Sequence, residues 1–249
     1  MKKLFALLLA LVMMMSLVAC GPQAPTEPSK PALTNPTNPA PTNPAPTNPS
    51  EPAVKNPESA VALLNALFAN MPEELLYQKD YETGDFFVNP ETGEREPNFN
   101  GGSPLFDEEG IPYPAAYNAA ALIDMTVEFA LYNLYVPEEF YANVEEAASL
   151  FHAMNGNFFT AGAMKMKEGT DLAAMAQGVR DALANNWWMC GSPDRYVVAT
   201  IDNYLFVVYG HDGAGDENFR NETLVTPFVK DLTTIYPSAQ ILFDELVGV

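Results

Sequence analysis

The sequence predicts an α+β domain that follows a proline-rich linker. Residues 196–201 and 204–209 are rich in β-branched and aromatic side chains, which favours two strands. Only Asp202 and Asn203 separate them, and both residue types tolerate the positive φ of a two-residue hairpin turn. Residues 172–187 carry apolar side chains at helical spacing before this hairpin. A segment near the N-terminus holds 12 of the 22 prolines.

A strand is predicted over residues 158–166, because they begin with aromatic residues and lie between two polar turns. They include Ala161, Gly162 and Ala163, which are poor strand formers. Gly178 lies in the middle of the predicted helix and costs about 1 kcal/mol relative to alanine. We expect a close approach of this helix to a sheet to explain the glycine.

The predicted sheet needs a covering layer on each side, because residues 204–209 are apolar on both alternating faces. A helix over residues 113–136, apolar around most of its circumference, is the candidate for the second layer. Residues 137–156 predict a further helix, and residues 57–71 predict the first helix of the folded region. Residues 78–114 are rich in turn residues, and we expect short strands or a functional loop there.

The C-terminal end completes the predicted sheet. Residues 226–237 predict a last helix, and residues 239–243 are either a closing strand or another helical turn. If they form a strand, this half has the β-α-β-β-α-β order of ferredoxin-like folds, with helices on one face. The expected organisation is a helical and loop-rich region over residues 57–156, whose helices cover the sheet, and an α+β domain over residues 157–249.

Residues 1–19 have the layout of a secretory signal. Two lysines precede an apolar run over residues 4–18, which is shorter than the ~20 residues of a membrane-spanning helix. The sequence Leu17-Val18-Ala19-Cys20 resembles the lipobox of bacterial lipoproteins. The resemblance implies cleavage before Cys20 and a diacylglycerol with palmitate-type chains on its sulfur, and two acyl chains suffice for stable anchoring. The alternative is an ordinary signal peptide with a chance cysteine.

Residues 20–56 form a low-complexity linker rich in proline, threonine and asparagine, with almost no large apolar side chain to bury. Such a segment is expected to be disordered and extended, with an upper reach on the order of 110 Å at ~3.1 Å per residue. The sequence thus predicts a spacer between the outer face of the cell membrane and an exported, folded domain.

Charge and cysteine content limit the possible partners. The chain has 32 acidic and 12 basic residues and a net charge of −20. Such a chain repels nucleic-acid phosphates and anionic lipid headgroups, which argues against nucleic-acid binding and against membrane docking by charge. Membrane contact is expected through the lipid on Cys20. Cys190 is then the remaining thiol, so no intramolecular disulfide can form.

Three stretches carry a family resemblance in addition to the lipobox and linker. They are a strand near residues 161–166, Lys167-Glu-Gly-Thr-Asp171 at a helix start, and Tyr196-Val-Val-Ala-Thr-Ile-Asp-Asn-Tyr-Leu-Phe-Val-Val208. Their order resembles small lipoproteins of Gram-positive anaerobes that carry a C-terminal domain of unknown function. The resemblance covers residues 136–236 and implies a location and a domain, without an activity or a functional residue to transfer.

Cys190 and two adjacent tryptophans form the first candidate site. A reactive Cys190 thiol would need a neighbouring base or a lowered pKa, and the alternative is a small buried apolar residue at a helix end. Trp187 and Trp188 are candidates for ligand contact, as a stacking platform for sugar rings or peptides. In the alternative, one tryptophan packs in the core and the other lies half exposed.

His211, Asp212 and Asp216 are further candidates for ligand contact, in a glycine-rich acidic loop. Oxygen atoms of Asp212, Asp216 and Asn218 could bind calcium, but their spacing fits no standard calcium loop, and a solvated acidic turn is the alternative. Two histidines cannot build a His-rich zinc site. No metal or cofactor is therefore expected, and the sequence lacks phosphate-binding and nucleophile motifs.

The leading functional prediction is a lipid-anchored cell-envelope protein whose domain acts without catalysis. It would bind an envelope protein, a peptide or a glycan, or serve as an accessory to another envelope component. The alternative is an envelope hydrolase that uses Cys190 or a pair of loop carboxylates for acid–base chemistry. The loop carboxylates in question are Asp80, Glu82, Asp85, Asp107, Glu108 and Glu109. A solute-binding lipoprotein is a third possibility, although the folded region is small for two lobes that close on a ligand.

Overall fold

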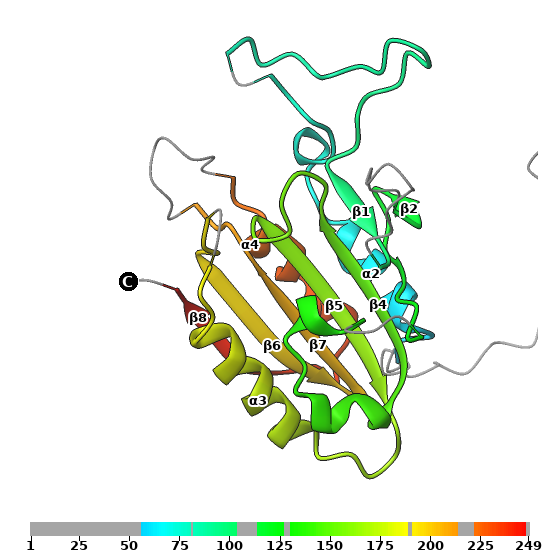
Figure 1. Cartoon of the computed structure of the whole chain (residues 1–249), viewed down its shortest axis with the longest axis vertical. Helices are drawn as coiled ribbons and strands as arrows, with labels where there is room; N and C mark the ends of the chain where they lie inside the picture. The colour runs from blue at the N-terminus through cyan, green and yellow to red at the C-terminus, as the bar shows by residue number, and fades with distance from the viewer. Residues whose placement is uncertain are drawn as a thin grey trace, which may run out of the picture. The chain divides into compact units, whose positions relative to one another are not determined.

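The computed structural model describes residues 56–80, 82–103, 114–126, 130–188, 191–213 and 222–247. They form an α+β domain built on one antiparallel sheet of eight strands (Figure 1). The strands are β1 (Phe99–Gly101), β2 (Ala116–Tyr117), β3 (Ala121–Leu122), β4 (Val144–His152), β5 (Phe159–Met166), β6 (Arg195–Ile201), β7 (Tyr204–Gly210) and β8 (Gln240–Leu246). The α-helices are α2 (Ala60–Phe68), α3 (Leu172–Ala184), α4 (Val225–Val229) and α5 (Leu232–Ile235), with short 3-10 helices η1 (Glu73–Leu75), η2 (Tyr132–Leu134) and η3 (Glu138–Asn143). The predicted signal, the linker before residue 56 and Cys20 lie outside the described residues.

The predicted strand–helix–hairpin unit is confirmed as β5, α3, β6 and β7. The β6–β7 hairpin pairs Ile201 with Tyr204, and Asp202 takes the positive φ of 52° that its turn requires. Helix α3 begins at Leu172. Asp171 is the N-cap, and its Oδ1 accepts a hydrogen bond from the backbone N of Ala174 at 3.0 Å.

Both faces of the sheet are covered, as the apolar pattern of β7 predicted, and Figure 1 shows α3 on the opposite face from α2 and α4. One core layer lies between the sheet and helices α2, α4 and α5, and the other lies under α3 and η2. Of the predicted N-terminal covering helices, only the one that became α2 (Ala60–Phe68) forms an α-helix against the sheet. The helix predicted over residues 113–136 was wrong, because the described part of this segment forms β2, β3 and η2. The segment does help to cover the second face, since Leu131, Leu134 and Val136 pack in the core layer under α3.

The helix predicted over residues 137–156 was also wrong. Its first part is η3, and its second part is β4, a long strand that pairs with β5. Residues 147–150 are all buried, because β4 is covered on both faces, and a stretch buried on both faces has no two-residue period that would distinguish a strand from a helix. The region predicted as helical and loop-rich therefore supplies β1 to β4, and the pairing of β4 with β5 joins it to the C-terminal strands in one sheet.

Residues 240–246 form the closing strand β8, but the sheet does not have the ferredoxin-like order. In that order the last strand would lie beside the first strand of the motif, which is β5 here. Strand β4 occupies that position, and β8 pairs with β6 at the edge of the sheet. The helices also differ, because α3 lies on one face and α4 and α5 lie on the other.

Two glycines mark places where segments approach closely. A Cβ atom on Gly162 would lie 2.5 Å from Cδ2 of Leu134, so the small residue in β5 admits η2 onto the sheet. A Cβ atom on Gly178 would lie 2.5 Å from Cγ of Pro137. The approach to the sheet expected at Gly178 was therefore wrong, because the close neighbour of this glycine is the Pro137 ring.

The expectation of short strands in the turn-rich region is met by β1 (Phe99–Gly101). An arm over residues 77–97 adds isolated bridges, and Figure 1 shows it extending beyond the sheet near β1. Gln78, Phe87 and Glu96 are nine residues apart. Their backbones form a ring of three hydrogen bonds of 2.9 Å each, from Gln78 N to Glu96 O, from Phe87 N to Gln78 O and from Glu96 N to Phe87 O. The arm is thus a local repeat with a nine-residue period.

The two turns of the arm repeat the same hydrogen bonds. Oδ1 of Asp80 accepts from the backbone N of Glu82 and Thr83, and Oδ1 of Asn89 accepts from the two equivalent residues, Glu91 and Thr92. Each turn then has a glycine at positive φ, Gly84 at 76° and Gly93 at 75°. The ring of Phe86 lies between the cations of the arm, with the Arg95 guanidinium 4.1 Å and the Lys79 Nζ 4.9 Å from its centroid.

Candidate functional site

A cavity of about 400 Å³ lies on the face of the sheet that also carries α3. Its floor comes from β4, β5 and β7, through Ser149, Phe151, Thr160 and Tyr209. Residues 130–135, which include η2, form one wall, and the β4–β5 connection over residues 153–157 forms another. The volume falls within the range of about 300–1,000 Å³ that is typical of small-molecule sites.

The described residues that line the cavity include no aspartate, glutamate, lysine or arginine. The polar ones offer amides, hydroxyls and one imidazole: Ser103, Asn133, Tyr135, Ser149, His152, Asn155, Asn157, Thr160 and Tyr209. This lining contrasts with a chain that has 32 acidic residues. A ligand buried against it would meet hydrogen-bonding partners but no counter-charge, so the lining favours an uncharged ligand.

The wall formed by η2 is fixed to the sheet by packing and by a hydrogen bond. Leu134 is 1% exposed and packs against the bare backbone of Gly162. The Tyr209 hydroxyl, rising from the sheet, donates to the backbone O of Asn133 at 2.9 Å. Burial raises the pKa of Tyr209 well above its usual range, so its hydroxyl remains a donor at all physiological pH values. The Asn133 side chain itself is exposed.

Three aromatic rings stand beside this wall. Tyr135, Trp188 and Tyr209 form a triangle with 5.5 Å between each pair of ring centroids. The side-chain amide of Asn186 donates to the Tyr135 hydroxyl at 2.8 Å, and burial raises the pKa of Tyr135 to about 12. The structure thus attaches Trp188 to the aromatic residues at the cavity, whereas Trp187 is 81% exposed. Of the two readings of this pair, the packing of one tryptophan against the core is what the structure shows for the partly buried Trp188, but Trp187 is more exposed than the half that this alternative expected.

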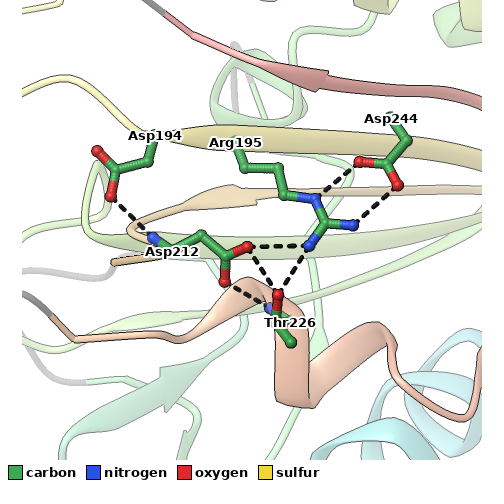
Figure 2. A network of polar contacts seen from close by, with 5 residues as sticks. All are labelled: Asp194, Arg195, Asp212, Thr226 and Asp244. Atoms are coloured by element: carbon green, nitrogen blue, oxygen red, sulfur yellow. Dashed lines mark hydrogen bonds and ion pairs between the residues drawn. The ribbon is translucent and has the colours of Figure 1, made fainter. Parts of the chain in front are cut away.

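The candidate loop residue Asp212 belongs to a separate network, which Figure 2 shows. Its Oδ2 lies 2.9 Å from Nη1 of Arg195 and accepts from Oγ1 of Thr226 at 2.7 Å. Its Oδ1 accepts from the backbone N of Thr226 at 2.7 Å. Arg195 also binds both carboxylate oxygens of Asp244, at 2.7 and 2.8 Å. These bonds raise the pKa of Arg195, with Asp244 as the largest cause, and they connect β6 to β8 and to the start of α4.

Asp212 has a structural role in this network. Both of its carboxylate oxygens already accept hydrogen bonds, and its backbone N donates to Oδ2 of Asp194 at 2.8 Å. Within residues 56–247, apart from the undescribed gaps, no group of three metal-ligating side chains occurs. Sequence reasoning missed Arg195, because its partners lie 17, 31 and 49 residues away along the chain and no local spacing relates them.

The remaining candidates do not gather at the cavity. His211 is buried, and its ring lies 4.6 Å from that of Phe158. Asp80 accepts hydrogen bonds within a turn of the arm, and Glu82 and Asp85 are exposed there. Cys190 and Asp216 lie outside the described residues, as do Asp107, Glu108 and Glu109. His152, which sequence reasoning did not single out, lines the cavity, and its Nδ1 accepts from the backbone N of Met154 at 3.3 Å.

Comparison of the chain with protein-family models, with curated proteins and with solved structures found no match. Among the described residues, no helix has both the length and the apolar character needed to cross a membrane. What the structure defines is therefore a class of protein: an α+β domain with a two-sided antiparallel sheet and an uncharged cavity on one face.

Proposed function

We propose that this protein is exported, anchored to the outer face of the cell membrane through lipid on Cys20, and that its folded domain binds a ligand without catalysing a reaction. The anchoring half is supported by the lipobox-like residues 17–20 and by the linker over residues 20–56. The linker would hold the domain clear of the bilayer surface.

The binding half is supported by one observation, the uncharged polar lining of the cavity. Hydrolysis of a glycosidic bond requires a proton donor and a base or nucleophile, commonly two carboxylates on either side of the bond. The described lining residues include no carboxylate and one histidine, His152, whose Nδ1 already accepts a backbone hydrogen bond. Amides and hydroxyls in a preformed cavity suit recognition better than acid–base chemistry.

Two experiments test the two halves. Metabolic labelling with a fatty acid should mark the wild type and leave Cys20→Ser unlabelled and released into the medium. An unlabelled wild type would contradict the anchor. For binding, a thermal-shift screen of uncharged small molecules should find a ligand that stabilises the domain by about 2.7 kcal/mol at a hundredfold excess over its Kd.

A cavity-filling variant locates the binding. Ala153 lines the cavity, so Ala153→Phe should abolish the thermal shift. Ala173 is exposed on α3 and does not line the cavity, so Ala173→Phe is the matched control and should keep the shift. Turnover of the ligand by the wild type would favour the hydrolase alternative over binding alone.

A further inference from the structure

The cavity lining offers both hydrogen-bond donors and hydrogen-bond acceptors. Oγ of Ser103 accepts from the backbone N of Asp124 at 3.0 Å, which leaves its hydroxyl proton to donate. Oγ of Ser149 donates to the backbone O of Gly102 at 2.8 Å, which leaves its lone pairs to accept. The exposed amide of Asn133 can do both. A ligand that matches this lining must itself both donate and accept hydrogen bonds, as hydroxyl groups do.

The aromatic residues beside the cavity add an apolar surface. Tyr135 lines the cavity and accepts from Asn186 through its hydroxyl oxygen, so its own proton is available to a ligand. Its ring is part of the triangle with Trp188 and Tyr209. A sugar ring has hydroxyl groups around its edge and C–H groups on its faces, so it can meet hydroxyl and amide partners while one face packs on an aromatic ring.

The surrounding strands offer no backbone edge for a peptide. At the cavity, β5 pairs with β4 on one side and with β7 on the other. Strand β4 in turn pairs with β1 and β3 on its far side. A peptide that adds to a sheet needs an unpaired strand edge, and β4, β5 and β7 are paired on both sides where their described residues line the cavity. The uncharged lining also disfavours an ionised ligand, whose charge would be buried without a partner.

Resting on the binding role proposed above, we infer that the cavity binds an uncharged saccharide. The side chains of Asn133, Ser103, Ser149 and Tyr135 hydrogen-bond its hydroxyl groups, and the Tyr135 ring packs against one of its faces. The full-length folded domain recognises the sugar by shape and by hydrogen bonds, without ionic contacts.

Isothermal titration calorimetry on the whole folded domain tests this assignment. The probes are neutral disaccharides (cellobiose, maltose and N,N′-diacetylchitobiose), their uronic-acid and amino-sugar counterparts, and uncharged hexapeptides. We expect a neutral disaccharide to bind and its charged counterparts to bind more weakly. Asn133→Ala and Tyr135→Phe should each weaken binding about three- to tenfold, as expected for one lost hydrogen bond. Gln177→Ala removes an exposed amide on α3 away from the cavity and should leave the affinity unchanged.

The outcomes separate the saccharide assignment from the binding role. If a hexapeptide or a charged sugar binds best and Ala153→Phe abolishes that binding, the saccharide assignment is overturned and the binding role stands. If a neutral disaccharide binds equally well to Ala153→Phe, the cavity is not its site, and the assignment is again overturned. If no probe and no compound of the thermal-shift screen binds the wild type at millimolar concentration, both proposals fail.

Discussion

Nη1 of Arg195 lies 2.9 Å from Oδ2 of Asp212, and the two side chains are only 19% and 8% exposed. The pair forms where β6 begins and β7 has just ended, and it continues to Thr226 in α4 and to Asp244 in β8 (Figure 2). One guanidinium therefore connects four segments of the C-terminal half. Because the pair is largely withdrawn from water, the loss of one partner leaves a poorly solvated charge.

Arg195→Met should lower the free energy of unfolding by about 3 kcal/mol, the scale expected when one partner of a buried ion pair is removed. Urea unfolding at neutral pH measures the change. Lys165 and Glu145 form a matched exposed pair, 3.6 Å apart with side chains 41% and 43% exposed. Lys165→Met should therefore cost less than about 1 kcal/mol. Equal losses in the two variants would show that the Arg195 network does not stabilise the fold beyond a surface contact.

Gly162→Ala should destabilise the domain by about 1–3 kcal/mol, because its new methyl group would overlap Leu134 at 2.5 Å in a well-packed layer. Leu134→Ala alone should also be costly, by about 2–5 kcal/mol, since Leu134 is a buried core residue. In the double variant the methyl group has room, so the combined loss should be smaller than the sum of the two single losses. Strict additivity would mean that η2 does not rest on Gly162.

Glu245 should make stability depend on acid pH. Its pKa is lowered, chiefly by hydrogen bonds from Arg180 and then by one from the Tyr196 hydroxyl. A carboxyl whose folded-state pKa lies below its unfolded value of about 4.3 stabilises the fold above that pH, and this contribution disappears as the pH falls through the lower, folded-state pKa. Unfolding measured from pH 3 to pH 7 should show a steeper acid loss for the wild type than for Glu245→Gln. Parallel curves would contradict the role of Glu245.

Glycine is required in the two turns of the arm for backbone reasons alone. A Cβ atom on Gly84 or Gly93 would have no atom within 4 Å, but both residues have positive φ. Gly93→Ala should therefore open its turn, at a cost of about 1–2 kcal/mol, and speed amide hydrogen exchange at Phe87 and Glu96. Gly93→Asn should behave more like the wild type, because asparagine tolerates this conformation. Equal exchange rates in the alanine variant and the wild type would show that the turn does not order the arm.

The sequence predicted best those elements whose patterns involve residues close together in the chain. Strands β6 and β7 were predicted with their turn, because β-branched residues and the Asp202-Asn203 pair act locally. Helix α3 was predicted from its apolar side chains at helical spacing. Strand β4 was taken for a helix, since its burial on both faces leaves no two-residue period. The nine-residue repeat of the arm could have been found by comparing residues 78–86 with 87–95, which share Glu-Thr-Gly.

The candidate site was less accessible to sequence reasoning. Trp188 was singled out and does contact the aromatic residues at the cavity. The cavity itself is lined from residues 102–103, 123, 130–135, 149–160 and 209, which the pairing of β1, β4, β5 and β7 and the packing of η2 on the sheet bring together. No regular spacing in the sequence identifies these cavity-lining residues. Asp212 is the opposite case: the sequence suggested it as a ligand-binding residue, but its carboxylate accepts hydrogen bonds from Arg195 and Thr226.

By itself, the sequence determined the local elements of the C-terminal half, the need for a two-sided cover, the acidic surface and the expectation of a lipid anchor, since each follows from neighbouring residues or from composition. Tertiary structure alone decided which strand lies beside β5 and which helices cover each face. It also decided which side chains come together to line the cavity on the sheet. The physical reason is that strand order and cavity shape depend on contacts between residues far apart in the chain, and those contacts leave no period in the sequence.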